Sequence, residues 1–150
     1  PMADVKQIAW AYLVARPEFM PLADAYAKQA GNPEFGQWRI NKDWYADLER
    51  SGLGQAFGVF EDDKLVGFAY TVLNVQPHFT SITVLAVDAI YVAPDARKKN
   101  GGLALLRALK AHAKAMKADG LLLGAKLNTD AHRLYEAVAK PMNTLFWWQV

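Results

Sequence analysis

Cysteine is absent from the 150 residues of the sequence, and histidine and serine are scarce. Without cysteine the chain has no disulfide framework, no thiolate nucleophile and no iron-sulfur cluster. The three histidines, His78, His112 and His132, are too far apart for a zinc-binding H-E-x-x-H helix, so we expect no metal. The two serines, Ser51 and Ser81, lie outside any G-x-S-x-G motif, which excludes a serine hydrolase of that type.

A strong charge excess and an apolar run of membrane length are also lacking. The 17 Lys and Arg residues against 15 Asp and Glu leave a net charge of +2, which is too small to indicate a nucleic acid or an anionic membrane as a partner. The most apolar stretch, Ser81 to Val92, is interrupted by Asp88 and is too short to cross a bilayer. We therefore expect a cytoplasmic protein whose partners include neither nucleic acid nor a membrane.

Apolar residues make up 53% of the chain, enough for a core, and no repeat or linker divides residues 1–150, so we expect one domain. Apolar residues recur at helical spacing in the N-terminal third and then alternate with a period of two from Gln55. We expect the following elements in chain order: helices at Asp4–Arg16, Pro21–Gln29 and Asn41–Arg50, a β-hairpin turning at Asp62-Asp63, a strand at Ser81–Val92, a helix at Gly102–Ala118, a strand at Leu121–Lys126, a helix at Asp130–Val138 and a strand at Leu145–Val150. This order indicates an α/β (α+β) fold in which helices pack on a mixed sheet.

A basic turn joins the third long strand to the helix that follows it. Arg97, Lys98 and Lys99 come just before two glycines at positions 101 and 102. The first N–H groups of a helix lack acceptors within the helix, its dipole is positive there, and glycine lets a phosphate approach the backbone. The pattern predicts an anion site, and the alternative is a solvated basic turn before an ordinary helix.

The residues around this turn resemble the GNAT superfamily of acyl-CoA-dependent N-acyltransferases, whose central motif reads V-x-P and then R/Q-x-x-G-x-G/A. The matching residues are Val92, Pro94, Arg97 and Gly102, and Asn100 stands where the family usually has glycine. Because asparagine enters positive φ at low cost, the turn can still form.

A second motif of the family, N-x-x-A-x-x-L-Y, matches the chain downstream. Asn128, Ala131, Leu134 and Tyr135 occupy its four defined positions. The resemblance covers roughly residues 55–150, and within the superfamily the chain looks most like small members encoded by phages or prophages.

The resemblance implies a GNAT-like mixed, mostly antiparallel sheet with helices on both faces and a splayed pair of parallel strands. It also implies transfer of an acetyl group from acetyl-CoA to an amine acceptor that the sequence does not identify. The residues that it places at acetyl-CoA are Ile90, Tyr91, Val92, Arg97, Lys98, Lys99, Asn100, Gly101, Gly102, Leu103 and Asn128. Those of the strand would pair with the pantetheine arm, those of the turn would hold the pyrophosphate, and Asn128 would contact the pantetheine amides.

Two residues are expected to act on the reacting groups. By resemblance Tyr135 protonates the departing thiolate, and the alternative is a tyrosine that only packs in the core. Asp88 is expected to act as the base, because a two-residue period puts Asp88, Ile90 and Val92 on one face of the strand. The alternative for Asp88 is pairing with a cation or capping a backbone group.

Other interpretations stay open at this level. Asn100, and Ala139 to Pro141 in place of the family's usual Gly-Phe, keep open a catalytically silent GNAT-fold binding module that acts on a host or viral partner. An acetyltransferase toxin that modifies charged tRNA is another alternative, against which the modest net charge argues. Five aromatic residues are candidates for an acceptor pocket or for the core: Trp38, Trp44, Tyr45, Trp147 and Trp148. The apolar strand expected at Leu145–Val150 could also pair across a homodimer.

Overall fold

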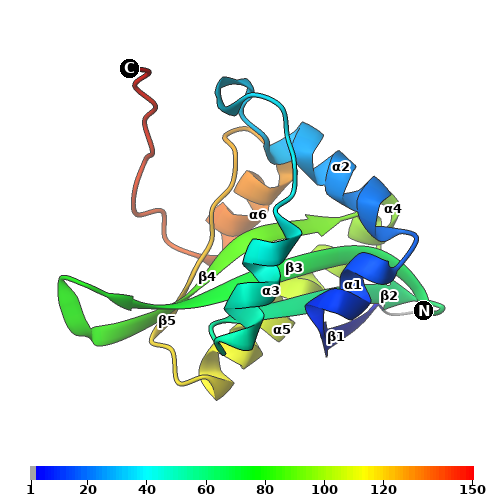
Figure 1. Cartoon of the computed structure of the whole chain (residues 1–150), viewed down its shortest axis with the longest axis horizontal. Helices are drawn as coiled ribbons and strands as arrows, with labels where there is room; N and C mark the ends of the chain where they lie inside the picture. Colours follow the sequence, from blue (N-terminus) through cyan, green and yellow to red (C-terminus); the bar gives the residue numbers. More distant parts are fainter. Residues whose placement is uncertain (1–2) are drawn as a thin grey trace.

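A five-stranded sheet in the order β1-β2-β3-β4-β5 forms the centre of the computed structural model, which describes residues 3–150 (Figure 1). Neighbouring strands are antiparallel except for β4 and β5, which run parallel. The strands are β1 (Asp4–Ile8), β2 (Gly54–Glu61), β3 (Lys64–Gln76), β4 (Phe79–Val92) and β5 (Gly120–Leu122). The predicted mixed, mostly antiparallel sheet is confirmed.

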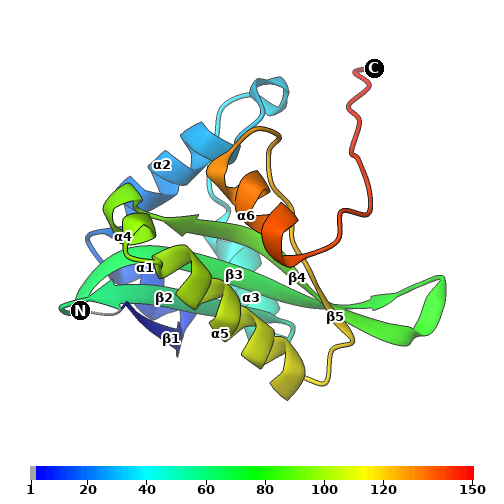
Figure 2. The same cartoon turned by 180° about the vertical axis from the view of Figure 1, so that it is seen from behind.

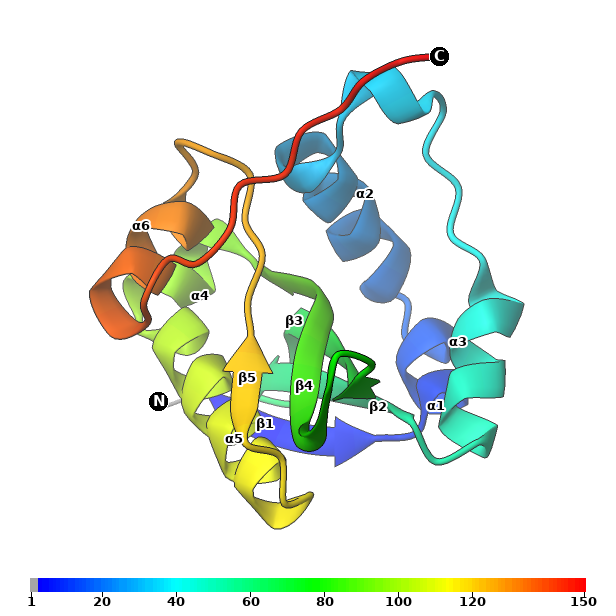
Figure 3. The same cartoon turned by 90° about the vertical axis from the view of Figure 1, so that its left-hand side faces the viewer.

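Helices cover both faces of this sheet, as predicted (Figures 2 and 3). One face carries α1 (Trp10–Ala15), α2 (Phe19–Ala30) and α3 (Lys42–Arg50), with a short 3₁₀ helix at Pro33–Phe35 after α2. The other face carries α4 (Pro94–Lys98), α5 (Gly101–Ala115) and α6 (Asp130–Val138). The molecule therefore has three layers, with a core on each side of the sheet.

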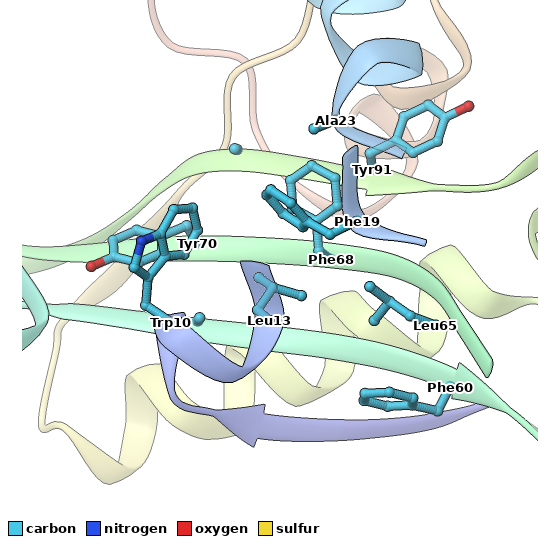
Figure 4. Packing of buried hydrophobic residues seen from close by; sticks show 11 residues of the cluster. Trp10, Leu13, Phe19, Ala23, Phe60, Leu65, Phe68, Tyr70 and Tyr91 are labelled. Atoms are coloured by element: carbon cyan, nitrogen blue, oxygen red, sulfur yellow. The ribbon is translucent and has the colours of Figure 1, made fainter. Parts of the chain in front are cut away.

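The core under α1, α2 and α3 is strongly aromatic (Figure 4). Trp10 meets Phe19 and Tyr70 edge-on at ring-centroid distances of 5.7 and 5.5 Å, and Phe19 lies 5.3 Å from Phe68. The core under α5 and α6 is mostly aliphatic, with Leu105 and Leu109 fully buried against the sheet. Buried apolar area of this kind is the main stabilising contribution in a domain of this size.

The N-terminal segment differs from the prediction of one helix over Asp4–Arg16. Residues Asp4–Ile8 form β1, each paired with a residue of β2, and only Trp10–Ala15 is helical. Their apolar residues fit helical spacing, but a ladder with β2 satisfies their backbone groups and extends the sheet, and this tertiary pairing outweighs local preference.

The prediction of a C-terminal strand is wrong. Leu145–Val150 forms no strand, and Leu145 and Trp148 are more than nine-tenths exposed. Trp147 makes one aromatic contact, with Phe35 at 5.1 Å. A homodimer through this segment stays a prediction.

Two other predictions also differ from the structure. The basic turn contains the short helix α4. The strand predicted at Leu121–Lys126 is shorter, because β5 ends at Leu122 and Leu123 to Lys126 pair with no strand.

The parallel pair β4 and β5 parts early. Pairing joins Val84 to Gly120, Leu85 to Leu121 and Ala86 to Leu122, and stops there. β4 continues to Val92 with β3 on one edge only. Residues 87–92 therefore present one backbone edge without a strand partner, which is the predicted splay.

Candidate active site

The start of α5 follows this open edge of β4 through a sharp turn. Asn100 adopts the left-handed conformation (φ 63°, ψ 23°) that lets the chain leave α4 and begin α5 at Gly101. A Cβ on Gly101 would lie 2.8 Å from the Ala96 carbonyl oxygen, so only glycine fits there. At Gly102 the nearest atom to such a Cβ is Leu134 Cδ2 at 3.7 Å, which leaves room for a side chain. The first turn of α5 is thus accessible at Gly102.

The two lysines of the basic turn have carboxylate partners. Lys98 Nζ lies 3.8 Å from Asp95, with both side chains exposed, and Lys99 Nζ lies 3.2 Å from Glu61. The second oxygen of Glu61 is buried without a partner among the described residues. The Lys98 pair is exposed and therefore weak, so Lys98 can exchange Asp95 for an anion, whereas Lys99 is paired with a largely buried carboxylate.

Arg97 is held differently, because its guanidinium bonds to three elements of the chain. Nε donates to the Val92 carbonyl oxygen at 2.5 Å, Nη2 donates to Gln29 of α2 at 2.6 Å, and Nη1 lies 3.3 Å from Asp130 of α6. The guanidinium also lies over the Tyr91 ring, 5.0 Å from its centroid. Direct contact of Arg97 with a pyrophosphate would compete with these partners.

Asp88 does not share a face with Ile90 and Val92, which corrects the prediction. Tyr70 pairs with Ala89 and Thr71 with Val87, so Asp88 sits in a bulge of β4 with no residue opposite. The extra residue breaks the two-residue alternation. The Asp88 carboxylate and Ala89 both face α2 and α3, whereas Ile90 and Val92 pack on the side of α5 and α6.

Tyrosines hold Asp88 on its face of the sheet. The Tyr45 hydroxyl donates to the carboxylate at 2.7 Å, and the Tyr26 hydroxyl donates to the backbone oxygen of Asp88 at 3.5 Å. Burial, and then the hydrogen bond to Asp88, raise the pKa of Tyr45. Asp88 is exposed and accepts from a phenol, so it is reachable by a ligand.

Tyr135 lies on α6 on the opposite side of β4, 8% exposed, in the aliphatic core. Burial first, and then the charge of Tyr26, raise the pKa of Tyr135 to about 12. No hydrogen bond contributes to that shift. Tyr26 is thus a neighbour of both predicted catalytic residues: its hydroxyl donates to the backbone oxygen of Asp88, and its ionised form would disfavour ionisation of Tyr135.

The segment before α6 places the remaining predicted residue. Asn128 is exposed and left-handed (φ 65°), and its backbone N–H donates to His132 Nδ1 at 3.2 Å. The Thr129 hydroxyl caps α6 by accepting from the His132 N–H. The structure thus brings the strand edge, the α5 start and the α6 start to one end of the sheet.

Sequence reasoning missed the polar partners of these residues. Gln29 and Tyr26 lie on α2 and bond to Arg97 and Asp88, which follow them by more than 60 positions. No motif marks such pairs, and only the packing of α2 against β4 shows them.

Residues 3–150 lack two features, a cluster of metal-ligating side chains and a helix of membrane-spanning type. No group of three or more His, Asp or Glu side chains in this part of the chain could hold a metal ion. None of the helices described is both long enough and apolar enough to cross a membrane.

Comparison with known proteins gives the same fold. Residues 16–139 match the model of the acetyltransferase (GNAT) family. The crystal structure of a ribosomal-protein-alanine N-acetyltransferase from Brucella melitensis biovar Abortus 2308 is 25% identical, with a TM-score of 0.74 over 100% of this chain and 99% of that one. No curated protein matches the sequence.

Two further structures are similar in fold. An aminoglycoside acetyltransferase from an uncultured soil metagenomic sample is 17% identical, with a TM-score of 0.75 over 100% of this chain and 99% of that one. A predicted acetyltransferase from Clostridium acetobutylicum, crystallised with acetyl-CoA, is 13% identical, with a TM-score of 0.69 over 99% of this chain and 96% of that one.

The three bonds of Arg97 predict a structural cost for its loss. Arg97→Met should lower the free energy of unfolding by about 2 kcal/mol, because the Val92 carbonyl, Gln29 and Asp130 each lose a donor. Urea titration measures this. Lys98→Met, at a side chain 80% exposed, is the control and should change stability by less than about 0.5 kcal/mol. Equal stability of the two variants would remove the structural role of Arg97.

Proposed function

Because the chain belongs to the acetyltransferase (GNAT) family, we propose that it transfers an acetyl group from acetyl-CoA to a primary amine by direct attack. The observation that carries this proposal is the parting of β4 from β5 beside the accessible first turn of α5. A solved structure of similar fold contains acetyl-CoA, which supports acetyl-CoA as the donor.

The donor would lie along the open edge of β4. Backbone groups of Ile90, Tyr91 and Val92 would pair with the pantetheine arm, and Asn128 would contact its amides. The N–H groups of the first turn of α5, at Gly101, Gly102 and Leu103, have no acceptor within the helix and can bind the pyrophosphate. Those of Lys99 and Asn100 already donate to the carbonyl oxygens of Ala96 and Arg97. The residues of this pyrophosphate site are Lys98, Lys99, Asn100, Gly101, Gly102 and Leu103, with Arg97 fixing the turn behind them.

The reaction needs no covalent enzyme intermediate. The lone pair of the neutral amine forms the new C–N bond at the thioester carbonyl, the C–S bond breaks, and CoA leaves as its thiolate. The amine loses one proton, through Asp88 or a water next to it, to solvent. The thiolate ends as a thiol after it takes one proton from Tyr135 or solvent.

Tyr135 would stabilise the leaving thiolate chiefly by hydrogen bonding. A phenol with a pKa raised to about 12 stays protonated at neutral pH. A thiol with a pKa of ~8.5 is the stronger acid, so full proton transfer from this phenol is uphill. The O–H donor is therefore worth most while negative charge develops on sulfur in the transition state.

Asp88 would act on the amine substrate. An aspartate with a reference pKa of ~3.9 is a weak base for an ammonium near ~10.4. It can still attract the ammonium and pass its proton to water, because the carboxylate is exposed and oriented by Tyr45. The alternative is a catalytically silent binding module for a host or viral partner. In such a module neither Asp88 nor Tyr135 would take part in a reaction.

Calorimetry with acetyl-CoA and an assay of thiol release over a panel of amines test the proposal together. Binding followed by release supports acetyl transfer. Binding without release from any amine would favour the silent module, and absence of binding would remove the donor site. Location in the cytoplasm, origin in a phage or prophage, one-domain organisation and a homodimer stay predictions.

The donor site predicts that Gly102→Glu abolishes acetyl-CoA binding in a folded protein. The side chain has space, since a Cβ meets only Leu134 Cδ2 at 3.7 Å, but it brings negative charge to the pyrophosphate site. Ala111→Glu, an exposed position farther along α5, is the control for charge. Unchanged calorimetric affinity in Gly102→Glu would contradict the assignment.

Removal of the Tyr135 hydroxyl should slow turnover without weakening the donor complex. We expect Tyr135→Phe to lower kcat by roughly ten- to a thousandfold, because the donor acts in the transition state. Acetyl-CoA affinity and melting temperature should change little. If Tyr135 only packs in the core, the variant should instead have a lower melting temperature and an unchanged kcat. The melting temperature and kcat are therefore measured on one preparation.

Asp88→Asn should change the pH dependence of the rate. Loss of the carboxylate should reduce kcat/KM most at low pH, where few amines are neutral, and least at high pH, with a typical contribution of about 10²- to 10⁴-fold. Steady-state rates across pH measure this. If the variant and the wild type show parallel profiles, water alone accepts the proton.

A further inference from the structure

An aromatic cavity of about 230 Å³ lies between α2, α3 and the strands β3 and β4, next to Asp88. Buried side chains line its inner part, and two of them, Phe68 and Tyr70, are labelled in the view of the core in Figure 4. Its rim carries two tryptophans, Trp38 at 37% exposure and Trp44 at 45%. Exposed tryptophans beside an aromatic lining present π surfaces to a ligand.

The wall of this cavity leads directly to Asp88. Tyr26 and Tyr45 line it, and the hydroxyls of both donate to Asp88, to its backbone oxygen and its carboxylate respectively. Ala89, the residue after Asp88, also lines it. A ligand that fills the cavity therefore has its end beside the exposed carboxylate proposed as the base.

Within residues 3–150, the cavity lining lacks the cluster of carboxylates that would bind a ligand with several positive charges. Arg39 is the only charged residue among the lining residues that the structure describes, and it lies on the exposed part of the lining. The nearby carboxylate of Glu49 accepts from the Trp10 backbone N–H at 2.7 Å and is not part of the lining. One carboxylate at the end and one cation at the rim suit a ligand with a single ammonium group.

The volume points the same way. A cavity of roughly 150 Å³ is enough to hold benzene, so about 230 Å³ accommodates one aromatic ring with a short chain. A molecule of several sugar rings would not fit inside.

We propose that the acceptor is a small aromatic monoamine, with its ring between Trp38 and Trp44 and its amino group at Asp88. This inference rests on the proposed acetyl transfer and names the class of its acceptor. The aromatic rings bind the body of the substrate, Asp88 attracts its ammonium, and Arg39 repels a second positive charge.

The test compares amines that differ in ring and in charge. Thiol release is measured with 2-phenylethylamine, with n-hexylamine, which keeps one charge but lacks the ring, and with spermidine and the aminoglycoside sisomicin, which carry several charges. We expect kcat/KM for 2-phenylethylamine to exceed that of each polycation by at least about tenfold. Preference for spermidine or sisomicin would overturn the inference and leave acetyl transfer standing.

Two variants and a control link the preference to this cavity. Trp44→Ala and Trp38→Ala should each raise KM for 2-phenylethylamine by about tenfold, with kcat and acetyl-CoA affinity unchanged, because they remove ring contacts only. Trp148→Ala, at a tryptophan 91% exposed that does not line the cavity, should change none of these values. Unchanged KM in both rim variants would also overturn the inference.

Calorimetry with 2-phenylethylamine in the presence of acetyl-CoA separates this inference from the proposed function. Binding that weakens in Trp44→Ala while no amine releases CoA would support the cavity assignment and contradict acetyl transfer. Absence of binding to the wild type would contradict the cavity assignment whatever the rates with other amines.

Discussion

The free edge of β4 beyond Ala86 is the constraint on which the rest of the site depends. β3 pairs with β4 over its length, but β5 covers the other edge for three residue pairs only. Backbone N–H and C=O groups need partners, and the Val92 and Asp88 carbonyl oxygens accept from Arg97 and Tyr26, which leaves the other groups of the uncovered edge available to a ligand. This edge leads to the end of the sheet where α5 and α6 begin. The starts of these two helices therefore border the proposed acetyl-CoA site.

The bulge at Asp88 lets the same strand serve two faces. A regular strand would put Asp88 with Ile90 and Val92 over α5 and α6. The extra residue instead turns the carboxylate toward α2 and α3, where Tyr45 orients it. Tyr135 stays on the opposite side of the strand, so the proposed base and the proposed hydrogen-bond donor to the thiolate lie on opposite sides of the edge. Direct transfer requires that two substrates be held close together in the right orientation, which an edge reached from both faces of the sheet allows.

Similarity of fold does not decide the acceptor. The similar structures include acetyltransferases named for a ribosomal-protein alanine and for aminoglycosides, which are chemically unlike acceptors. The open strand edge and the glycine turn are backbone features that many sequences can build. The aromatic cavity beside Asp88 is built from side chains of α2, α3 and the segment between them, and we infer that acceptor choice is encoded there.

By itself the sequence determined the elements whose signals are local. α6 has the predicted bounds because its Thr129 cap and apolar spacing lie within a few residues of one another, and the hairpin turns at Asp62 and Asp63 because both tolerate positive φ. The turn at Asn100 and the motif around Tyr135 could also be predicted, because their signals lie within a few neighbouring residues. Only the tertiary structure decided that Asp4–Ile8 is a strand, that Asp88 faces α3 and that Arg97 bonds to Gln29 and Asp130. Each of these depends on partners more than 30 positions away, where local propensity and short motifs carry no information about pairing.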